Sequence, residues 1–200
     1  MSLNNIEKFK EKISRGQTCV GVAISFADPA VSELFGDAGY DFTWIDMEHC
    51  PIDPHMALGH VMAVRGTDTA PFIRVPWNDP VLIKPLLEFE PAGIIVPLIR
   101  TAEEATLAVE ACKYPPKGRR GFGPRRGVKF GGLDTRAYIE EADSRTLVIV
   151  QIEHIDAVRH IESILAVPGL DAVCIRPLRQ NRLETRAVWG NAVRSPHASP

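Results

Sequence analysis

The chain has 200 residues, which is enough for one domain with a sizeable buried core. Its hydrophobic fraction of 45% and charged fraction of 24% are ordinary for a globular protein, and a formal charge of −2 gives no electrostatic reason to bind nucleic acid or an acidic membrane. No apolar run approaches the roughly 20 residues needed to span a bilayer, and the first residues are too polar for a secretory signal. The four cysteines are scattered without a Cys-x-x-Cys pair, so we expect free thiols in a reducing, cytoplasmic compartment.

Short apolar runs alternate with helical patterns along most of the chain. The runs are rich in Val and Ile and predict strands covered on both faces, at residues 19–25, 42–46, 71–75, 93–98, 147–152 and 172–175. Capping residues predict helix starts at residues 28–29, 53–54, 79–80, Thr101, Asp134 and Asp156. Strand–helix units repeated about every 25 residues indicate a parallel sheet. The length of this series favours a closed α/β barrel over an open doubly wound sheet.

The pattern stops after Ile175. Residues 176–200 carry five arginines and one glutamate, with no convincing strand and no amphipathic period. We therefore expect two parts, a (β/α) barrel domain over residues 1–175 and a divergent, basic, irregular tail over residues 176–200.

Ionisable residues follow several of the predicted strands directly. Asp46 and His49 follow the second strand, Arg74 lies at the end of the third, and Glu153 follows the strand at 147–152. Each residue also has a purely structural alternative. Asp46 could anchor a loop, and His49 could be an ordinary loop histidine. Arg74 could pair with a neighbouring carboxylate, and Glu153 could cap the next helix. In a parallel barrel, however, the strand ends share one open mouth, so we expect these side chains to converge. Their joint position favours a functional site.

The residue types suit proton abstraction beside a polarised carbonyl. His49 is the natural general base, because only histidine has an unperturbed side-chain pKa near neutral pH. Arg74 is permanently charged and can stabilise an enolate oxygen. Glu153, together with a second oxygen ligand, can hold a hard divalent cation such as Mg²⁺ or Mn²⁺.

Five segments, in the expected order, resemble the HpcH/HpaI aldolase family, the class II 2-keto-3-deoxy acid aldolases of the pyruvate-binding barrel superfamily: residues 42–49, 74–80, 93–97, 114–121 and 150–153. The resemblance covers residues 5 to 175. It implies an eight-stranded (β/α)8 TIM-type barrel, usually a homohexamer, that cleaves 4-hydroxy-2-oxo acids to pyruvate and an aldehyde. It also implies a divalent metal (Mg²⁺, Mn²⁺ or Co²⁺) and no Schiff base.

The resemblance also implies roles for single residues. His49 matches the base, and Arg74 matches the residue that stabilises the enolate and binds substrate. Gln151 matches a polar residue lining the substrate site, and Asp46 belongs to the same motif as the base. Glu88 falls where the family has a carboxylate, often Asp, that orients the histidine.

The metal site is where the sequence departs from the family. Glu153 matches the first metal carboxylate, and the second is expected in a Gly-Pro-x-Asp motif after the strand at 172–175. The run here is Arg-Pro-Leu-Arg, with Arg176 in place of the glycine and Arg179 in place of the metal ligand. Arginine removes an anionic ligand and repels the cation. We therefore expect a barrel truncated after its seventh strand and interpret the end as a frameshift or gene-end error, which a Gly-Pro-x-Asp motif in another reading frame would support.

Two other functions compete with the aldolase. The first is a catalytically inactive scaffold that keeps the barrel's packing surfaces but lacks a competent metal site. The second is a relative acting on CoA thioesters, which is disfavoured because His49 in its Asp-x-Glu-His motif resembles the aldolase branch.

The expected partners are small molecules, a 2-oxo acid and an aldehyde, besides further copies of the chain. A basic, glycine-rich segment at 117–129 contains one aromatic residue and no flanking motif of a nucleic-acid-binding module. Because 2-oxo acids are anions, we expect this segment to line the substrate's path into the site.

Overall fold

The computed structural model describes residues 3–175 as an α/β fold on one parallel sheet. The strand order is β1-β2-β3-β4-β5-β6, and every neighbouring pair is parallel. The strands are β1 Gly21–Ile24, β2 Phe42–Asp46, β3 Ala70–Arg74, β4 Gly93–Val96, β5 Leu147–Ile152 and β6 Ala172–Ile175. All six predicted apolar runs are confirmed as strands, with the ends of the first, third and fourth shifted or shortened.

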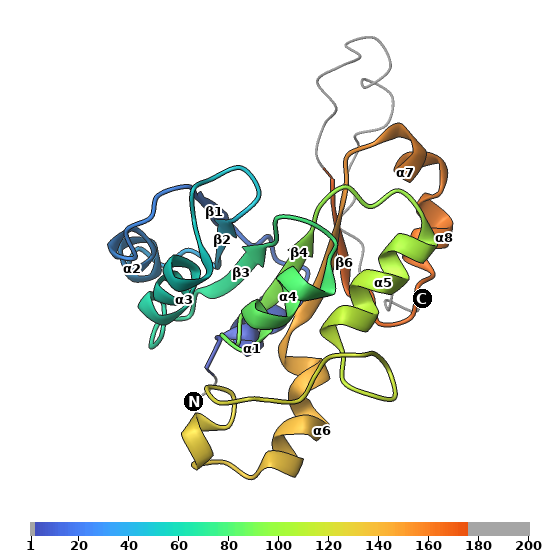
Figure 1. Ribbon diagram of the computed structural model, residues 1–200. Coiled ribbons are helices and arrows are strands. Elements are labelled where there is room, and N and C mark those ends of the chain that lie inside the picture. The colour runs from blue at the N-terminus through green and yellow to red at the C-terminus, as the bar shows by residue number, and fades with distance from the viewer. Residues whose placement is uncertain (1–2, 176–200) are drawn as a thin grey trace.

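The sheet curls from β1 to β6 without closing (Figure 1). Within residues 3–175, β1 and β6 are its two edges, so this part of the chain forms a curled half-barrel. The described residues contain six strands, so the expected seventh strand is not among them. Arg176, Arg179 and the rest of the predicted tail lie outside the described residues.

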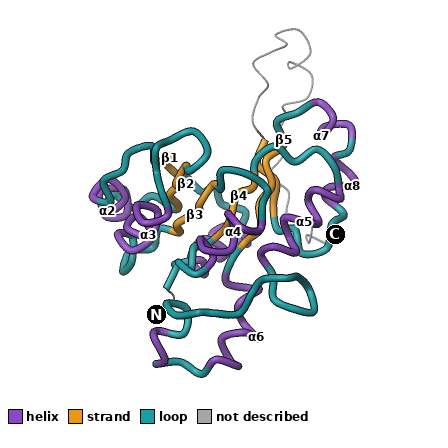
Figure 2. Tube along the Cα trace, in the orientation of Figure 1, coloured by secondary structure: helices purple, strands orange, loops and turns teal. Residues whose placement is uncertain are grey.

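Helices connect the successive strands, as parallel pairing requires. They are α2 Ala30–Asp37, α3 Pro54–Ala63, α4 Pro80–Leu87, α5 Ala102–Cys112, α6 Thr135–Arg145, α7 Ile155–Arg159 and α8 Ile161–Leu165. A further helix, α1 Ile6–Ser14, precedes β1. The long loop between α5 and α6 contains a short 3-10 turn, Lys129–Gly131 (Figure 2). Within the described part of the chain, no helix combines the length and apolarity that crossing a membrane requires.

Most predicted helix starts are confirmed by capping hydrogen bonds. A side-chain oxygen accepts from the backbone N–H two or three residues later at Asp53, Asp79, Thr101 and Asp134. The prediction for Asp156 is wrong. The cap of α7 is His154, whose Nδ1 accepts from the Asp156 N–H at 3.2 Å, and the expected single helix is divided into α7 and α8 at His160.

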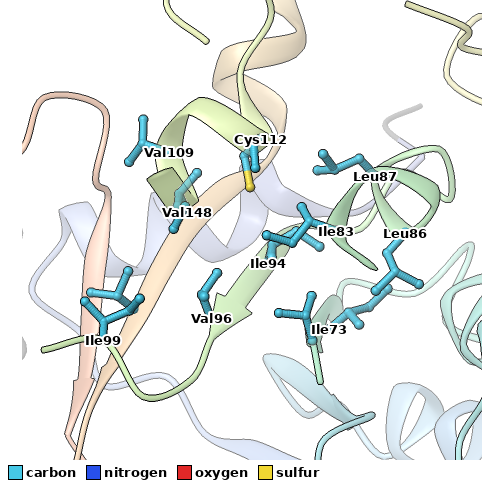
Figure 3. Packing of buried hydrophobic residues seen from close by; sticks show 14 of the residues in the cluster. Ile73, Ile83, Leu86, Leu87, Ile94, Val96, Ile99, Val109, Cys112 and Val148 are labelled. Atoms are coloured by element: carbon cyan, nitrogen blue, oxygen red, sulfur yellow. The ribbon is translucent and has the colours of Figure 1, made fainter. Parts of the chain in front are cut away.

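One face of the sheet packs against α4 and α5 in an apolar layer (Figure 3). The strands contribute Ile73, Ile94 and Val148, all fully buried. The helices contribute Ile83, Leu86, Leu87, Val109 and Cys112. Cys112 is a free thiol, as expected, and burial raises its pKa to about 12, which disfavours the reactive thiolate.

The opposite face is covered by α1 at the N-terminal ends of the strands. Ile6 is fully buried there, and the Phe9 ring packs edge-on against Phe72 with 5.0 Å between the centroids. Because strand side chains alternate between faces, the same face carries Asp46 and Arg74, which are paired in register, at its C-terminal edge. This face of the sheet is thus apolar at the N-terminal ends of the strands and polar at their C-terminal ends.

Candidate active site

A buried ion pair between Asp46 and Arg74 organises the C-terminal edge of the sheet. Arg74 donates from Nε to Asp46 Oδ1 at 3.0 Å and from Nη2 to Asp46 Oδ2 at 2.5 Å. This two-point contact fixes the plane of the guanidinium as well as its position. Burial alone raises the pKa of Asp46, but the hydrogen bonds from Arg74 and from the backbone outweigh it and hold that pKa below its usual value.

The same carboxylate folds the turn that follows β2. Asp46 Oδ1 accepts from the backbone N–H groups of Glu48 and His49 at 3.0 and 3.2 Å. The turn therefore brings Glu48 and His49 back toward Arg74. Asp46 does act as a loop anchor, the structural alternative considered for it, while also orienting the arginine.

The Nη1 side of Arg74 faces groups from other strands. Its Nη1 lies 2.9 Å from Glu48 Oε2 and donates to Gln151 Oε1 at 3.4 Å, and the Trp44 ring lies 5.5 Å from its central carbon. Burial lowers the pKa of Arg74, but the hydrogen bonds and charge of Asp46, with the charges of Glu48 and Glu153, raise it further above its usual value. Arg74 therefore remains a fixed cation at the end of β3.

Gln151 and Glu153 extend this network to the end of β5. Gln151 donates from Nε2 to Glu153 Oε2 at 3.1 Å, and Glu153 Oε1 accepts from the Leu98 backbone N–H at 3.0 Å. Leu98 follows β4 in the left-handed backbone region, with φ of 57°. Of the four side chains predicted to converge, Asp46, Arg74 and Glu153 thus belong to one hydrogen-bonded group, which also includes Gln151.

His49 lies at the rim of this group. Its side chain is 53% exposed, and its Nε2 lies 3.5 Å from Glu48 Oε1. An accessible imidazole beside a buried cation can exchange protons with a bound molecule. Glu48, with a side chain only 10% exposed, is a site residue that we did not predict from the sequence, although its place between Asp46 and His49 could have indicated it.

The described residues do not make a complete metal site. Within residues 3–175, no three His, Cys, Asp or Glu side chains are grouped so that they could hold a metal ion. Glu153 can supply one carboxylate, and both of its oxygens already accept hydrogen bonds. A typical divalent-cation site needs more oxygen ligands than this.

The structure places Glu88 away from the group around Arg74 within this chain, so its expected role of orienting His49 stays a prediction. Glu88 follows α4, which runs back from the end of β3 to the start of β4, so it lies at the N-terminal edge of the sheet. Its Oε1 lies 3.3 Å from Nη2 of the buried Arg120, whose guanidinium stacks 4.5 Å from the Tyr114 ring.

The basic segment at 117–129 is also placed differently from the expectation. It contains Arg120 and belongs to the loop between α5 and α6, at the N-terminal edge of the sheet. Arg126 of the same loop donates to the Phe89 carbonyl, directly after Glu88. In this chain the segment therefore packs at the N-terminal edge of the sheet and does not line the group around Arg74.

Comparison with known proteins decides the family. The family model described as HpcH/HpaI aldolase/citrate lyase matches residues 20–178. The chain belongs to this family. It is 38% identical over 174 residues to a hydroxypyruvate/pyruvate aldolase of Roseobacter denitrificans, covering 86% of this chain and 67% of that protein. It is 36% identical over 176 residues to a 4-hydroxy-2-oxovalerate aldolase of Novosphingobium aromaticivorans, covering 86% of this chain and 65% of that protein.

Two solved structures agree with the fold. An HpcH/HpaI aldolase from Desulfitobacterium hafniense aligns with a TM-score of 0.78 at 30% identity, covering 84% of this chain and 65% of that one. Macrophomate synthase aligns with a TM-score of 0.76 at 25% identity, covering 87% of this chain and 61% of that one. This HpcH/HpaI family chain therefore spans about two thirds of the length of the relatives it matches, and its six strands correspond to part of their fold.

Proposed function

We propose that this chain is the larger part of an aldolase, a carbon–carbon lyase that cleaves a 4-hydroxy-2-oxo acid to pyruvate and an aldehyde. The observation that carries the proposal is the buried Arg74, which is held at two points by Asp46 and donates to Gln151, with the imidazole of His49 at the rim. Relatives named as aldolases support the same reaction type.

The proposed steps follow from the side chains. His49 takes the proton of the substrate's 4-hydroxyl, the bond between C3 and C4 breaks, and its electron pair forms the enolate of pyruvate. Arg74 stabilises the negative oxygen of that enolate, because a fixed buried cation needs little reorganisation as charge develops. His49 then returns its proton to C3, which completes pyruvate. Gln151 donates no proton in this scheme and orients the bound acid.

We also propose that a divalent cation, Mg²⁺, Mn²⁺ or Co²⁺, takes part, with Glu153 as one ligand. When bound, such a cation polarises the 2-oxo group of the substrate. Within residues 3–175, Glu153 is the one carboxylate suited to this role, and the ligand set is incomplete.

The test is pyruvate release from 4-hydroxy-2-oxovalerate, followed by coupled reduction of the product. We expect release with Mn²⁺ or Mg²⁺ and its loss with EDTA. Arg74→Lys should lose roughly 100-fold or more in kcat, because a lysine cannot make the two-point contact with Asp46. The matched control is Arg136→Lys, since Arg136 is 89% exposed in a surface ion pair with Glu140. Equal activity of Arg74→Lys and the control would refute the role of Arg74.

The second candidate function is an inactive scaffold. It is favoured by the incomplete ligand set in residues 3–175 and by Arg176 and Arg179 in the sequence where the metal motif is expected. A folded sample that binds no Mn²⁺ and releases no pyruvate would support the scaffold. Saturable Mn²⁺ binding that is lost in Glu153→Ala would support the aldolase.

A further inference from the structure

Glu48 has contacts that the reaction scheme above does not use. Its Oε2 lies 2.9 Å from Arg74 Nη1, and its Oε1 lies 3.5 Å from His49 Nε2. One carboxylate thus lies between the cation expected to bind the enolate and the imidazole expected to move the proton. Among the described residues, Oε2 is buried and has no partner that meets hydrogen-bond geometry.

Glu48 is not needed to neutralise Arg74. Asp46 already contacts the guanidinium through two hydrogen bonds, at 3.0 and 2.5 Å. A second carboxylate at 2.9 Å adds negative charge to a pair that is already balanced. The group that can balance Glu48 is His49, once its imidazole has taken up a proton.

Glu48 is also unfavourable for folding as an anion. Burial raises its pKa, Arg74 and His49 offset part of this effect, and Glu153 and Asp46 add to it. Since the folded-state pKa is raised, the ionised carboxylate destabilises the folded chain above the pKa of the unfolded state. A group that disfavours folding while contacting two candidate catalytic residues is better explained by function than by stability.

We propose that Glu48 is a positioning residue that holds the His49 imidazole beside Arg74 and stabilises its protonated form during proton transfer. This inference rests on the proposed aldolase function. The proton comes from the substrate's 4-hydroxyl, resides on the imidazole while the enolate exists, and is returned to C3. Glu48 stays ionised throughout and faces the positive charge as it forms on His49. The 3.5 Å separation shortens to a hydrogen bond as the imidazole becomes charged.

The experiment isolates the proton-transfer step by following exchange of the pyruvate methyl protons for deuterium in D₂O by ¹H NMR. The chain is tested with Mn²⁺ washed out and Mg²⁺ present, since Mn²⁺ broadens the resonances. The variants are Glu48→Gln, which removes the charge at constant size, and Glu48→Asp, which keeps the charge on a shorter side chain. The control is Glu140→Gln, whose side chain is 67% exposed on α6.

We expect Glu48→Gln to lower the kcat for exchange about tenfold or more, a part of the roughly 10²- to 10⁴-fold that general acid–base catalysis contributes. The KM for pyruvate should change much less, and the Tm should be unchanged or higher. Glu48→Asp should recover part of the rate. Wild-type exchange in Glu48→Gln, or a rate that falls only together with Tm, would overturn this inference while leaving the proposed function intact. Absence of exchange in the wild-type chain would instead overturn the proposed function, and the role of Glu48 with it.

Discussion

The pair of Asp46 and Arg74 makes a quantitative prediction about stability. The two side chains are only 11% and 8% exposed, so Asp46→Asn leaves a guanidinium that is almost fully buried without its two-point partner. Removing one member of a buried pair costs about 3–5 kcal/mol. Glu48 remains 2.9 Å from Arg74 Nη1 as a second counter-charge, so we expect the lower end, about 3 kcal/mol.

The measurement is thermal unfolding at neutral pH, followed by circular dichroism. A loss of about 3 kcal/mol lowers Tm by about 6–12 °C in a domain of this size. The control is Asp156→Asn, because Asp156 belongs to an exposed ion pair with Arg159 and should change stability by less than about 0.5 kcal/mol. Since the folded-state pKa of Asp46 lies below its usual value, its contribution is present above the unfolded-state pKa and is lost as the pH falls. The difference between the wild type and Asp46→Asn should therefore shrink in acid.

A double variant separates the charge from the packing. Adding Arg74→Met to Asp46→Asn removes the unpaired cation, and it should recover much of the lost stability. The coupling between the two substitutions should be about 1–3 kcal/mol. At about 2–4 °C per kcal/mol, a difference of about 2 °C in Tm corresponds to less than about 1 kcal/mol. A Tm for Asp46→Asn within about 2 °C of the Asp156→Asn control, with no coupling to Arg74→Met, would therefore refute the mutual dependence of this buried pair.

Two further predictions concern packing away from the site. Burial lowers the pKa of His60 below its usual value of 6.5, because it penalises the protonated imidazole, so the folded chain loses stability as the pH falls below that value. This loss between about pH 7 and 5 should flatten in His60→Gln, as measured by urea unfolding. At Gly127 a Cβ would lie 2.5 Å from Glu90 Oε1 and from the Tyr138 ring, so Gly127→Ala should cost about 1–3 kcal/mol, whereas Gly123→Ala, with nothing within 4 Å, should be nearly neutral.

The centre of the sheet could be predicted from the sequence because β3, β4 and β5 are buried on both faces. Runs such as 147–152 are apolar at nearly every position and are bounded by polar residues, so the ends of this strand could be predicted from the sequence. The helix α1 was not predicted. Its buried apolar contribution rests on few residues, chiefly Ile6 and Phe9, and its N-cap Asn5 makes no side-chain capping hydrogen bond.

The site could be predicted in part because parallel strands place their ends together. Asp46, Arg74, Gln151 and Glu153 each lie at or just after a strand end, and the register of the sheet brings them into contact. Glu88 shows the limit of this reasoning. Its sequence position matches the family pattern, but the length and direction of α4 determine where it lies in space. That place is the opposite edge of the sheet, next to Arg120.

The charges at this edge give an argument for a cation that is independent of family resemblance. The carboxylates of Asp46 and Glu48 contact one guanidinium, that of Arg74, and the charge of Glu153 also acts on it. The group has a formal charge of −2 when all three carboxylates are ionised and the imidazole of His49 is neutral. An anionic 2-oxo acid would be repelled from such a group. A bound divalent cation would cancel that charge and admit the substrate.

We therefore expect the folded chain to bind Mn²⁺ at one saturable site, measured by the loss of the free-ion EPR signal. Glu153→Gln should weaken this binding about tenfold or more, as loss of one anionic ligand does, and Glu140→Gln should not. Pyruvate should bind more tightly when Mn²⁺ is present, because the two charges then attract. Weak, non-saturable Mn²⁺ binding by a folded sample would contradict the argument. Without a bound cation, the negative charge around Arg74 would repel the anionic substrate. The inactive scaffold would then better explain a chain with Arg179 in place of the second metal carboxylate.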